Sequence, residues 1–502
     1  MESSRGQPLI TLQRYSPPEQ ASMYGSTHDE NIFPESSLKD GSAGEEKLTN
    51  GTYTIDEAIE HGGFGRLNIT VLVCTVLMWS NVNTILFSPA ILPDLIRCSI
   101  GLTKIQTSTM IALVYVGYFI GNFIFGTISD RYGRKSTILL ATGCAAFFSL
   151  LFSFADSYSW ITFFQVIIAM VSSGMMSCMS LCLEFMPVDK RSYVMFSALS
   201  NVTFSGWYSL ICWTFLDHAQ NWRWVLRICH VLPFAFTFPM YYYLVPESPR
   251  YLSTVGKTVE ASEVFRKLWR VNHVDVLQGQ LVHNEEIKER GSMLESLKYP
   301  FLLSTILLSV LWMSNAITYY GGIFLVTQLN KSCQGKTGHE EIACITSKDL
   351  LNIFLTSLGD VPGIFLCLPL MERWGRRMTL AFLCLILSLS FIPLYFCQIV
   401  KYSWIPVSFI RAAGVAIDAA LEVYVPEVYP TYFRNAAVNT VKIGERIGMI
   451  ATPFLSKWLI TVNYNLTLGI LTALTLGSSI VAACLPKEIA HKKLVDVQEQ
   501  KM

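Results

Sequence analysis

Charged residues are scarce in this 502-residue chain. It has 38 Lys and Arg and 37 Asp and Glu, so 15% of its residues are charged and 52% are apolar. Ordinary soluble domains are roughly 25% charged, and a soluble protein of this size has too much surface for so few charges. The formal net charge is +1, so no bulk charge attracts nucleic acid. This composition is a poor match to a soluble protein and to a nucleic-acid-binding protein.

Other common signatures are missing too. The first 60 residues are polar and hold no apolar run, so we expect no secretory signal there but a disordered tail, in which residues 54–59 can form a short helix. The thirteen cysteines have no repeated short spacing, which argues against a zinc framework or a disulfide-dense scaffold. Without metal-ligand spacing, a nucleophile elbow or a nucleotide-binding glycine loop, we expect no enzyme, no cofactor and no metal.

What the chain does have is a series of apolar runs of about 20 residues, the length that crosses a bilayer as a helix. Twelve occur, at residues 67–92, 106–128, 136–155, 159–183, 194–216, 223–244, 299–327, 350–371, 378–398, 402–424, 438–461 and 466–485. They predict an all-α membrane protein with a cytosolic tail (1–60), an N-terminal six-helix bundle (61–244), a central cytosolic loop (245–298), a C-terminal six-helix bundle (299–487) and a cytosolic C-terminal tail (488–502).

Lys and Arg in the short loops indicate the orientation of these helices. They gather after the even-numbered runs, at Arg131, Arg134, Lys135, Lys190, Arg191, Arg373, Arg376, Arg377 and Arg434. Both termini are therefore predicted to face the cytosol, and the loop 328–349 to lie on the opposite side. That loop carries a glycosylation sequon at Asn330 together with Cys333 and Cys344. In an oxidising lumen the two cysteines can pair, and two free thiols are the alternative.

Two motifs occur in both halves at nearly the same offset. The loop segment 126–135 recurs at 372–377, and the segment 184–191, with the pattern Glu…Pro…Arg, recurs at 427–434. Each copy lies at the cytoplasmic end of a corresponding run. Parallel six-helix repeats place a solute site near the middle of the bilayer between the halves and suit alternating access.

These residues resemble the major facilitator superfamily, whose cytoplasmic loop signature corresponds to segment 126–135. Segment 245–252 is similar to a motif of its sugar and organic-ion branches. Within them, the sequence resembles the synaptic vesicle 2-related protein family at residues 63–66, 314–321, 346–349, 362–363, 426–431 and 446–448. The resemblance implies the major facilitator fold, with twelve transmembrane helices in two six-helix bundles, and residence in a vesicle or plasma membrane.

The repeated loop motifs are candidate gates. Gly133 permits a tight turn, and Asp130 can hold an opposing helix N-terminus or an Arg in one conformer and release it in another. The resemblance implies such a latch, and passive anchoring at the membrane surface is the alternative. Ion pairs between the acidic residues and the neighbouring loop motif would close the cytoplasmic side. The predicted gating residues are Asp130, Arg131, Gly133, Arg134, Lys135, Glu184, Arg191, Glu372, Arg373, Arg376, Glu427, Arg434 and Arg446.

The candidate solute residues lie in the seventh and tenth runs. Asn315 and Tyr319 share one face of a helix, followed by Tyr320, and they either line the cavity or pack helices. Asp418 and Glu422 are spaced i, i+4, and ionisable groups at bilayer depth mark solute or proton pathways. These two carboxylates either bind a cation or a shared proton, or form salt bridges with Arg411, Lys442 or Arg446. Asp360 has the same two interpretations.

The N-terminal half lacks the charges expected from the resemblance. Val82 and Ile85 stand where related proteins have acidic residues, Asn81 and Asn83 are polar but neutral, and Gln165 replaces an expected Arg. This moves the charged face of any cavity into the C-terminal half and favours a neutral or zwitterionic solute, or facilitated diffusion without coupling. His230, within the sixth run, either titrates near neutral pH or packs as a neutral imidazole.

We therefore predict a monomeric secondary carrier that moves a small organic solute, an organic ion or zwitterion, by alternating access. A transport-inactive vesicle membrane protein with a role in binding, sorting or regulation is the alternative. The expected partners are the solute, the lipid bilayer and a coupling proton or cation, without nucleic acid. The predicted cavity residues are Asn315, Tyr319, Tyr320, Asn81, Asn83, Gln165, Asp418 and Glu422, and the coupling candidates are Asp360, Asp418 and Glu422.

Overall fold

The computed structural model describes residues 51–187, 190, 208–212, 214, 222–281, 296–333, 345–396, 402–429 and 434–485. These residues all belong to one compact unit, Thr49–Met502. Helices make up most of it. The one sheet in this part of the chain is a parallel pairing of β1 (Thr52–Tyr53) with β2 (Gln280–Leu281).

The N-terminal half is a set of helices joined by short turns. Thr103 begins its longest helix with a capping box, because the Gln106 amide donates to the Thr103 hydroxyl at 3.3 Å and the Thr103 amide donates to the Gln106 side chain at 2.9 Å. The elements are α2 (Arg66–Phe87), η1 (Ser88–Ala90), α3 (Leu92–Ile100), α4 (Lys104–Tyr132), α5 (Arg134–Phe152), α6 (Tyr158–Ser172), η2 (Ser173–Met176), α7 (Ser177–Leu183), α9 (Trp222–Leu226), η4 (Arg227–Val231) and α10 (Leu232–Leu244).

The C-terminal half repeats this helical pattern. Gly375 has a φ of +77° and breaks the long helix α15, which therefore contains parts of the eighth and ninth predicted runs. The elements are α13 (Leu302–Cys333), α14 (Ser347–Ser357), α15 (Asp360–Phe391), η6 (Ile392–Tyr395), α16 (Trp404–Val428), α17 (Arg434–Pro453), η8 (Phe454–Leu459), α18 (Ile460–Val462) and α19 (Tyr464–Ala483).

Nine helices within the described residues are long and apolar enough to cross a membrane. They correspond to the first four, the seventh to tenth and the twelfth predicted runs. The fifth run lies mostly outside the described residues. The sixth and eleventh runs are helical, and each contains a π-helical stretch, η4 and η8. Large apolar side chains such as Phe147 and Phe409, 57% and 59% exposed, lie on the outer surface, as expected for contact with lipid.

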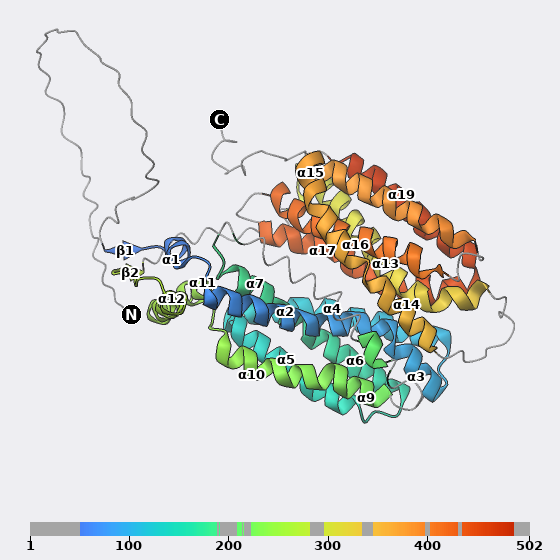
Figure 1. Ribbon diagram of the computed structural model, residues 1–502, viewed down its shortest axis with the longest axis horizontal. Coiled ribbons are helices and arrows are strands. Elements are labelled where there is room, and N and C mark those ends of the chain that lie inside the picture. Colours follow the sequence, from blue (N-terminus) through green and yellow to red (C-terminus); the bar gives the residue numbers. More distant parts are fainter. Residues whose placement is uncertain are drawn as a thin grey trace, which may run out of the picture. The chain divides into compact units, whose positions relative to one another are not determined.

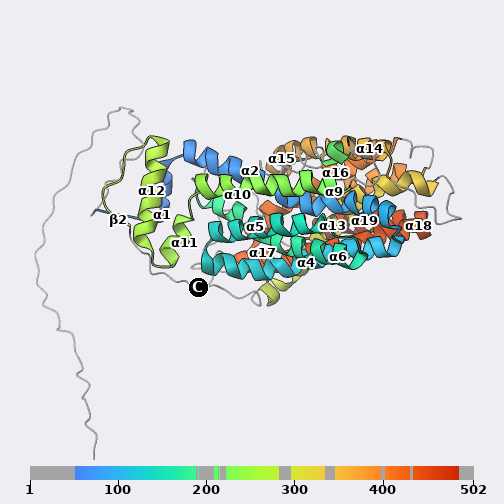
Figure 2. The same cartoon turned by 90° about the horizontal axis from the view of Figure 1, so that it is seen from below.

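Figure 1 shows the N-terminal half, coloured blue to green, beside the C-terminal half, coloured yellow to red. The two halves meet at the end that carries α3 and α14, which we call the far end. The helices α1 (Ile55–Gly62), α11 (Pro249–Thr254) and α12 (Thr258–Asn272) lie at the opposite, near end (Figures 1 and 2). Across the halves, α4 packs against α17 and η8.

The near end is held together by contacts between α1, α2 and α12. The Trp269 indole donates to the Ala58 carbonyl at 3.0 Å, and the Asn272 amide donates to Gly62 at 2.9 Å and to Asn68 at 2.8 Å. The short helix expected at residues 54–59 is present as α1, capped by Thr54. The boundary predicted at residue 60 therefore falls inside a packed helix, because the buried face of α1 anchors it to the central segment.

Candidate functional site

Glu247 binds the first loop motif, residues 126–135. Its carboxylate accepts hydrogen bonds from the backbone amides of Arg134 at 3.1 Å and Lys135 at 3.0 Å, and so caps the N-terminus of α5. Gly133 precedes that helix with a φ of +99°, and a Cβ there would collide with the Glu247 carboxylate. Only glycine suits this turn. Glu247 lies in the motif 245–252, but sequence reasoning assigned it no gating role.

Glu184 binds the same loop. Arg134 Nε lies 2.7 Å from Glu184 Oε1, and the Ser248 hydroxyl donates to the same carboxylate. Burial raises the pKa of Glu184, and the neighbouring Arg134 guanidinium opposes this shift. Asp130 and Arg131, predicted to act with this motif, are exposed, and within the described ranges no ion pair involves either side chain.

The second copy repeats the arrangement with its own residues. Arg376 donates two hydrogen bonds of 3.2 Å to the Glu427 carboxylate, and Glu372 and Arg373 are exposed. Thus Glu184 and Glu427 both pair with an arginine of the loop motif in their own half. Their other predicted partners, Arg191 and the side chain of Arg434, lie outside the described residues.

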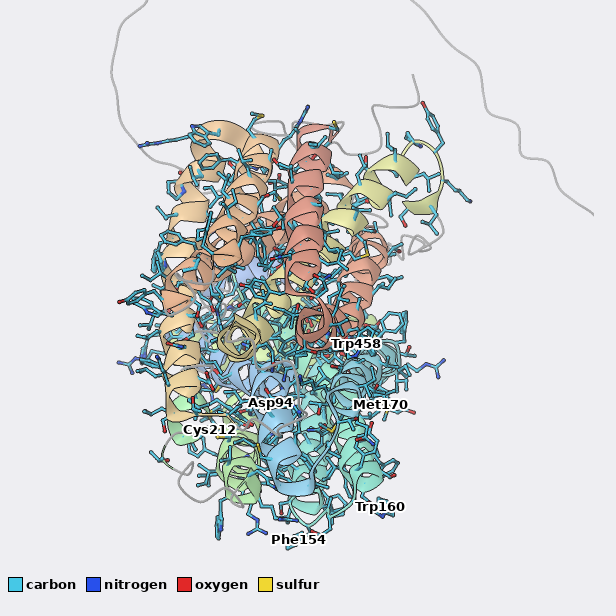
Figure 3. The ribbon with its side chains drawn as sticks, turned by 90° about the vertical axis from the view of Figure 1, so that its right-hand side faces the viewer. Asp94, Phe154, Trp160, Met170, Cys212 and Trp458 are labelled. Carbon is cyan, nitrogen blue, oxygen red and sulfur yellow. The ribbon has the colours of Figure 1, made fainter. Side chains whose placement is uncertain are left out.

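The far end has an ion pair that joins the two halves. Lys457 of η8 lies 3.1 Å from Asp94 of α3, and their side chains are 4% and 8% exposed. Lys457 also donates to the Pro89 carbonyl at 3.4 Å and lies over the Phe324 ring at 5.3 Å. Figure 3 looks onto this side, with Asp94 labelled near Trp458 of the opposite half. This pair is not predicted from the sequence, although Lys457 is separated by eleven positions from the nearest other charge in its apolar run.

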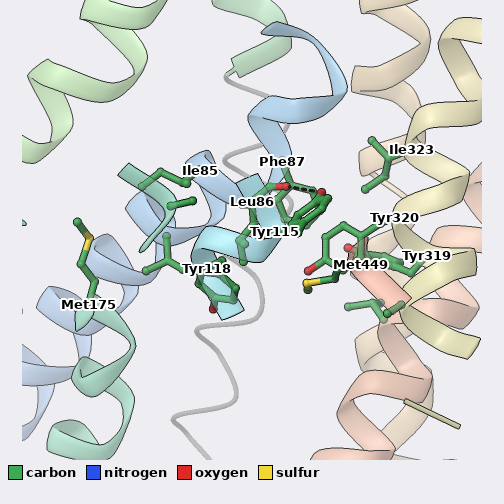
Figure 4. Packing of buried hydrophobic residues seen from close by; sticks show 14 of the residues in the cluster. Ile85, Leu86, Phe87, Tyr115, Tyr118, Met175, Tyr319, Tyr320, Ile323 and Met449 are labelled. Atoms are coloured by element: carbon green, nitrogen blue, oxygen red, sulfur yellow. Dashed lines mark hydrogen bonds between the residues drawn. The ribbon is translucent and has the colours of Figure 1, made fainter. Parts of the chain in front are cut away.

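Aromatic side chains cross between the halves in the core. Phe87 of α2 lies 6.2 Å from Tyr319 and 5.7 Å from Tyr320 of α13, measured between ring centroids. Tyr115 of α4 lies 6.0 Å from Tyr320 and donates to the Leu86 carbonyl at 3.2 Å (Figure 4). The predicted cavity residues Tyr319 and Tyr320 therefore belong to a packed aromatic cluster between the halves.

Asp360 and Arg411 form a fully buried ion pair. Arg411 Nε donates to Asp360 Oδ1 at 3.1 Å, a second guanidinium nitrogen donates to Oδ2, and neither side chain is exposed. The Tyr319 hydroxyl also donates to Asp360 at 3.3 Å. Of the three acids considered above as partners of Arg411, the structure pairs it with Asp360 and not with Asp418 or Glu422, since α15 and α16 pack side by side.

Asn315 and Asp418 meet between α13 and α16. The Asn315 amide donates to Asp418 Oδ1 at 2.6 Å and to the Gly414 carbonyl at 3.1 Å. Its own carbonyl oxygen has no hydrogen-bond partner among the described residues. A Cβ on Gly414 would lie 2.7 Å from the Tyr319 ring, so this glycine lets α13 and α16 approach.

Further charges extend this cluster toward the near end. Glu422 pairs with Lys442 at 2.5 Å, and Glu445 pairs with Arg446 at 3.1 Å. Lys442 lies 5.3 Å from the centroid of Trp312. For Glu422 the salt bridge with Lys442 is therefore present, while the Glu422 side chain stays 48% exposed.

Arg446 reaches across to the N-terminal half. Its guanidinium carbon lies 4.7 Å from the centroid of the Tyr118 ring on α4, a cation–π contact. Predicted as a gating residue, Arg446 thus lies with the charged cluster on α16 and α17. With Asp418, Glu422, Lys442 and Glu445, it presents charges of both signs between the two halves.

The predicted polar residues of the N-terminal half lie elsewhere. Asn81 donates to the Thr237 hydroxyl at 2.7 Å, and Asn83 is buried. Gln165 lines a separate cavity of about 20 Å³ together with His230. Neither His230 nitrogen, nor the Gln165 carbonyl oxygen, has a hydrogen-bond partner in the described part of the chain. The structure therefore does not bring Gln165 to Asn315 and Asp418.

Two other predictions concern the loop 328–349. The Asn330 and Cys333 side chains and all of Cys344 lie outside the described residues, so the glycosylation site and the disulfide stay predictions. Cys98 at the end of α3 is disulfide-bonded, a possibility that the sequence analysis did not consider. Across the described residues, no group of acidic, His or Cys side chains has the arrangement of a metal site.

Two repeated helical halves with a charged cluster between them define a membrane transporter of the major facilitator type. A model of the sugar (and other) transporter family matches residues 80–461, and the chain belongs to this family. The chain is 27% identical over 479 residues to the synaptic vesicle 2-related protein of Rattus norvegicus, covering 91% of this chain and 85% of that protein. The predicted fold and family resemblance are confirmed.

Two further comparisons agree. The chain is 26% identical over 491 residues to the organic cation/carnitine transporter 7 of Arabidopsis thaliana, covering 89% of this chain and 97% of that protein. The xylose transporter XylE of E. coli, in an inward-open conformation, superposes with a TM-score of 0.62 at 13% identity, covering 84% of this chain and 98% of that structure.

Proposed function

We propose that this multi-pass membrane transporter moves a small organic cation or zwitterion by alternating access. The observation that carries the proposal is the Asn315–Asp418 pair between α13 and α16. Asp418 supplies a negative charge to a cationic group, and the free Asn315 carbonyl oxygen supplies an acceptor. Aromatic faces nearby, such as Tyr320, suit an organic cation because cations bind over aromatic rings.

Basic residues in the same cluster support binding of a zwitterionic solute as well as of a solute that carries only a positive charge. Lys442 and Arg446 lie beside Glu422 and Glu445, so an anionic group on the solute also finds a counter-charge. The Arabidopsis relative named an organic cation/carnitine transporter matches nearly the whole chain, which supports the same solute class for this chain.

The pattern of ion pairs indicates which side is closed. At the far end Lys457 and Asp94 connect the halves, whereas at the near end Arg134–Glu184 and Arg376–Glu427 each stay within one half. The exposed side of Glu422 cannot face hydrocarbon, because a carboxylate there is too costly. We therefore infer access to the charged cluster from the near end, which the distribution of Lys and Arg places in the cytosol.

To change from the conformation open at the near end to one open at the far end, the protein would break the far-end contacts and form new contacts between the halves at the near end. The protein would act in a vesicle or plasma membrane with both termini in the cytosol. A coupling proton or cation is a further proposal, for which Asp418 is the candidate. Asp360 is a weaker one, because Arg411 already neutralises it.

Uptake by purified protein in liposomes tests the proposal. The panel contains quaternary ammonium cations and trimethylammonium zwitterions, measured with and without a proton gradient. Asp418→Asn should lower uptake at least tenfold, because the cationic group loses its counter-charge. The matched control is Asp156→Asn, whose carboxylate is 84% exposed and pairs with Arg223, and it should transport normally. Normal uptake by Asp418→Asn would contradict the site, and no uptake of any solute by the wild type would favour the transport-inactive alternative.

A further inference from the structure

A small cavity lies between the two halves, on the far-end side of the charged cluster. It has a volume of about 10 Å³, and residues of both halves line it: Thr84, Phe87, Tyr208, Ile323, Ile353 and Arg411. Such a volume holds about one water molecule. In the conformation described, Phe87 lines it and contacts Tyr319 and Tyr320 of the other half.

Two polar atoms in the walls of this cavity have no hydrogen-bond partner among the residues that the structure describes. Arg411 Nη1 and the Tyr208 hydroxyl are buried, and neither makes a hydrogen bond to any described residue. Arg411 is 0% exposed and Tyr208 is 4% exposed. Asp360 occupies Nε and Nη2 of Arg411. The guanidinium carbon lies 6.0 Å from the centroid of the Phe87 ring and 5.8 Å from that of Tyr319, and Nη1 has no acceptor in the described part of the chain. Buried donors are nearly always satisfied in proteins, so something outside the protein chain should accept from them.

The chemistry of the cavity selects an acceptor oxygen. The Thr84 hydroxyl already donates to the Ser80 carbonyl at 2.9 Å, and the remaining walls are apolar. Asp360 balances the charge of Arg411, so the cavity does not demand a full negative charge. A second cation would meet the guanidinium and find no free carboxylate. A hydroxyl, carbonyl or carboxylate oxygen is an acceptor that suits either donor.

The cavity is well placed to act together with Asp418. Arg411 and Asp418 both belong to α16, seven residues or about two turns apart, which is about 10 Å along the helix axis. Tyr319 connects the two groups, because it donates to Asp360 and packs against Gly414 beside Asn315. A solute with a cationic group at Asp418 can therefore extend an oxygen toward Arg411 when the halves separate at the far end.

We propose that Arg411 Nη1 and the Tyr208 hydroxyl form a subsite for an oxygen of the transported solute. The carrier then prefers organic cations that bear a hydroxyl, carbonyl or carboxylate oxygen at a distance from the cationic group over cations that bear none. This inference rests on the proposed function, because it assumes that an organic cation or zwitterion occupies the space between the halves.

Matched pairs of probes isolate the contribution of the oxygen. One series is the trimethylammonium carboxylates of increasing chain length, and the other is the alkyltrimethylammonium ions of the same lengths. Binding to the purified full-length protein is measured by calorimetry, and uptake in liposomes. For the wild type, we expect one chain length at which the carboxylate binds at least tenfold more tightly than its alkyl counterpart, since a buried donor that gains an acceptor adds about that factor.

Tyr208→Phe removes one hydroxyl and keeps the ring. It should reduce the preference for the carboxylate about tenfold and leave the alkyl cation unchanged. The control is Tyr241→Phe, because Tyr241 is also fully buried with an unpartnered hydroxyl but does not line the cavity. A monodisperse elution profile confirms that each variant is folded.

The outcomes separate this proposal from the one before it. If the wild type binds both series but shows no preference for the oxygen, or if Tyr208→Phe weakens both series equally, the subsite is wrong and the proposed function stands. If the wild type neither binds nor moves any probe, the proposed function fails and the subsite fails with it. If Tyr241→Phe loses the preference as Tyr208→Phe does, the effect is not specific to the cavity and the subsite is again wrong.

Discussion

Asp360→Asn tests whether the buried ion pair with Arg411 is structural. Neither side chain is exposed, and two guanidinium nitrogens donate to the carboxylate. An amide at position 360 leaves the Arg411 charge buried without a counter-charge. Removing one partner of a buried pair costs about 3–5 kcal/mol of unfolding free energy. The hydroxyl of Tyr319 can still donate to the amide oxygen, so that contact adds little to the loss.

A double variant distinguishes the stability contribution of the ion pair from the cost of leaving one of its charges unpaired. Asp360→Leu combined with Arg411→Met removes both charges and keeps most of the volume. Replacement of a buried ion pair by apolar residues is often neutral or stabilising, so we expect the double variant to lie within about 2 kcal/mol of the wild type. Asp156→Asn serves as the exposed control, and loss of its surface pair should cost less than about 1 kcal/mol.

The assay is equilibrium unfolding in mixed micelles, followed by tryptophan fluorescence, for which the chain offers eleven residues. The expected order of stability is wild type, exposed control and double variant close together, with Asp360→Asn well below them. A loss of under about 1 kcal/mol in Asp360→Asn would refute the reasoning, because the cost of an unpaired buried charge should be several times larger. Asp360 would then be better regarded as a carboxylate that becomes neutral during the cycle, as expected of a coupling group.

Two further predictions concern the ends of the molecule. Asp94→Asn removes the carboxylate that pairs with the buried Lys457, so the far end should open more often. This should appear as a several-fold faster reaction of a cysteine introduced beside the pair with a membrane-impermeant thiol reagent, and exchange of the two charges should slow that reaction again. An ordinary Glu has a pKa near 4.3. Burial raises the pKa of Glu184 above that value, so this carboxyl protonates at a higher pH than an ordinary Glu. Falling cytosolic pH should therefore weaken its pair with Arg134 and change thiol accessibility at the near end, whereas Glu184→Gln should show the altered accessibility at every pH and no pH dependence.

Hydrophobic patterning predicted most of the fold. Apolar runs and the positive residues between them are local features of the chain, so helix positions needed no knowledge of packing. The membrane-spanning helices with the weakest apolar pattern were those that contain polar residues. The eleventh run carries Lys442, Glu445, Arg446 and Lys457, and these charges lower its hydropathy. All four pair with a charged residue inside the protein, three of them within their own half.

Partnerships within the candidate site were harder to predict. Helical spacing predicted that Asn315 and Tyr319 share one face of a helix. Spacing within one helix cannot show which neighbouring helix supplies a hydrogen-bond or ion-pair partner. Arg411 therefore had three plausible acids by spacing, and its actual partner Asp360 lies on α15. Asp94 and Lys457 meet only because the two halves pack together, and no local pattern in the sequence records that contact.

The Lys457–Asp94 pair also has an electrical consequence. The two charges are in contact, so they lie at the same depth in the membrane, one on each half. When the halves part, these charges move away from each other mainly along the membrane plane. Work against the transmembrane potential, about 2.3 kcal/mol per elementary charge at 100 mV, arises for displacement across the membrane. In the proposed cycle, separation of this pair therefore carries almost no gating charge, and the membrane potential acts mainly on the charges of the solute and of any coupling proton or cation.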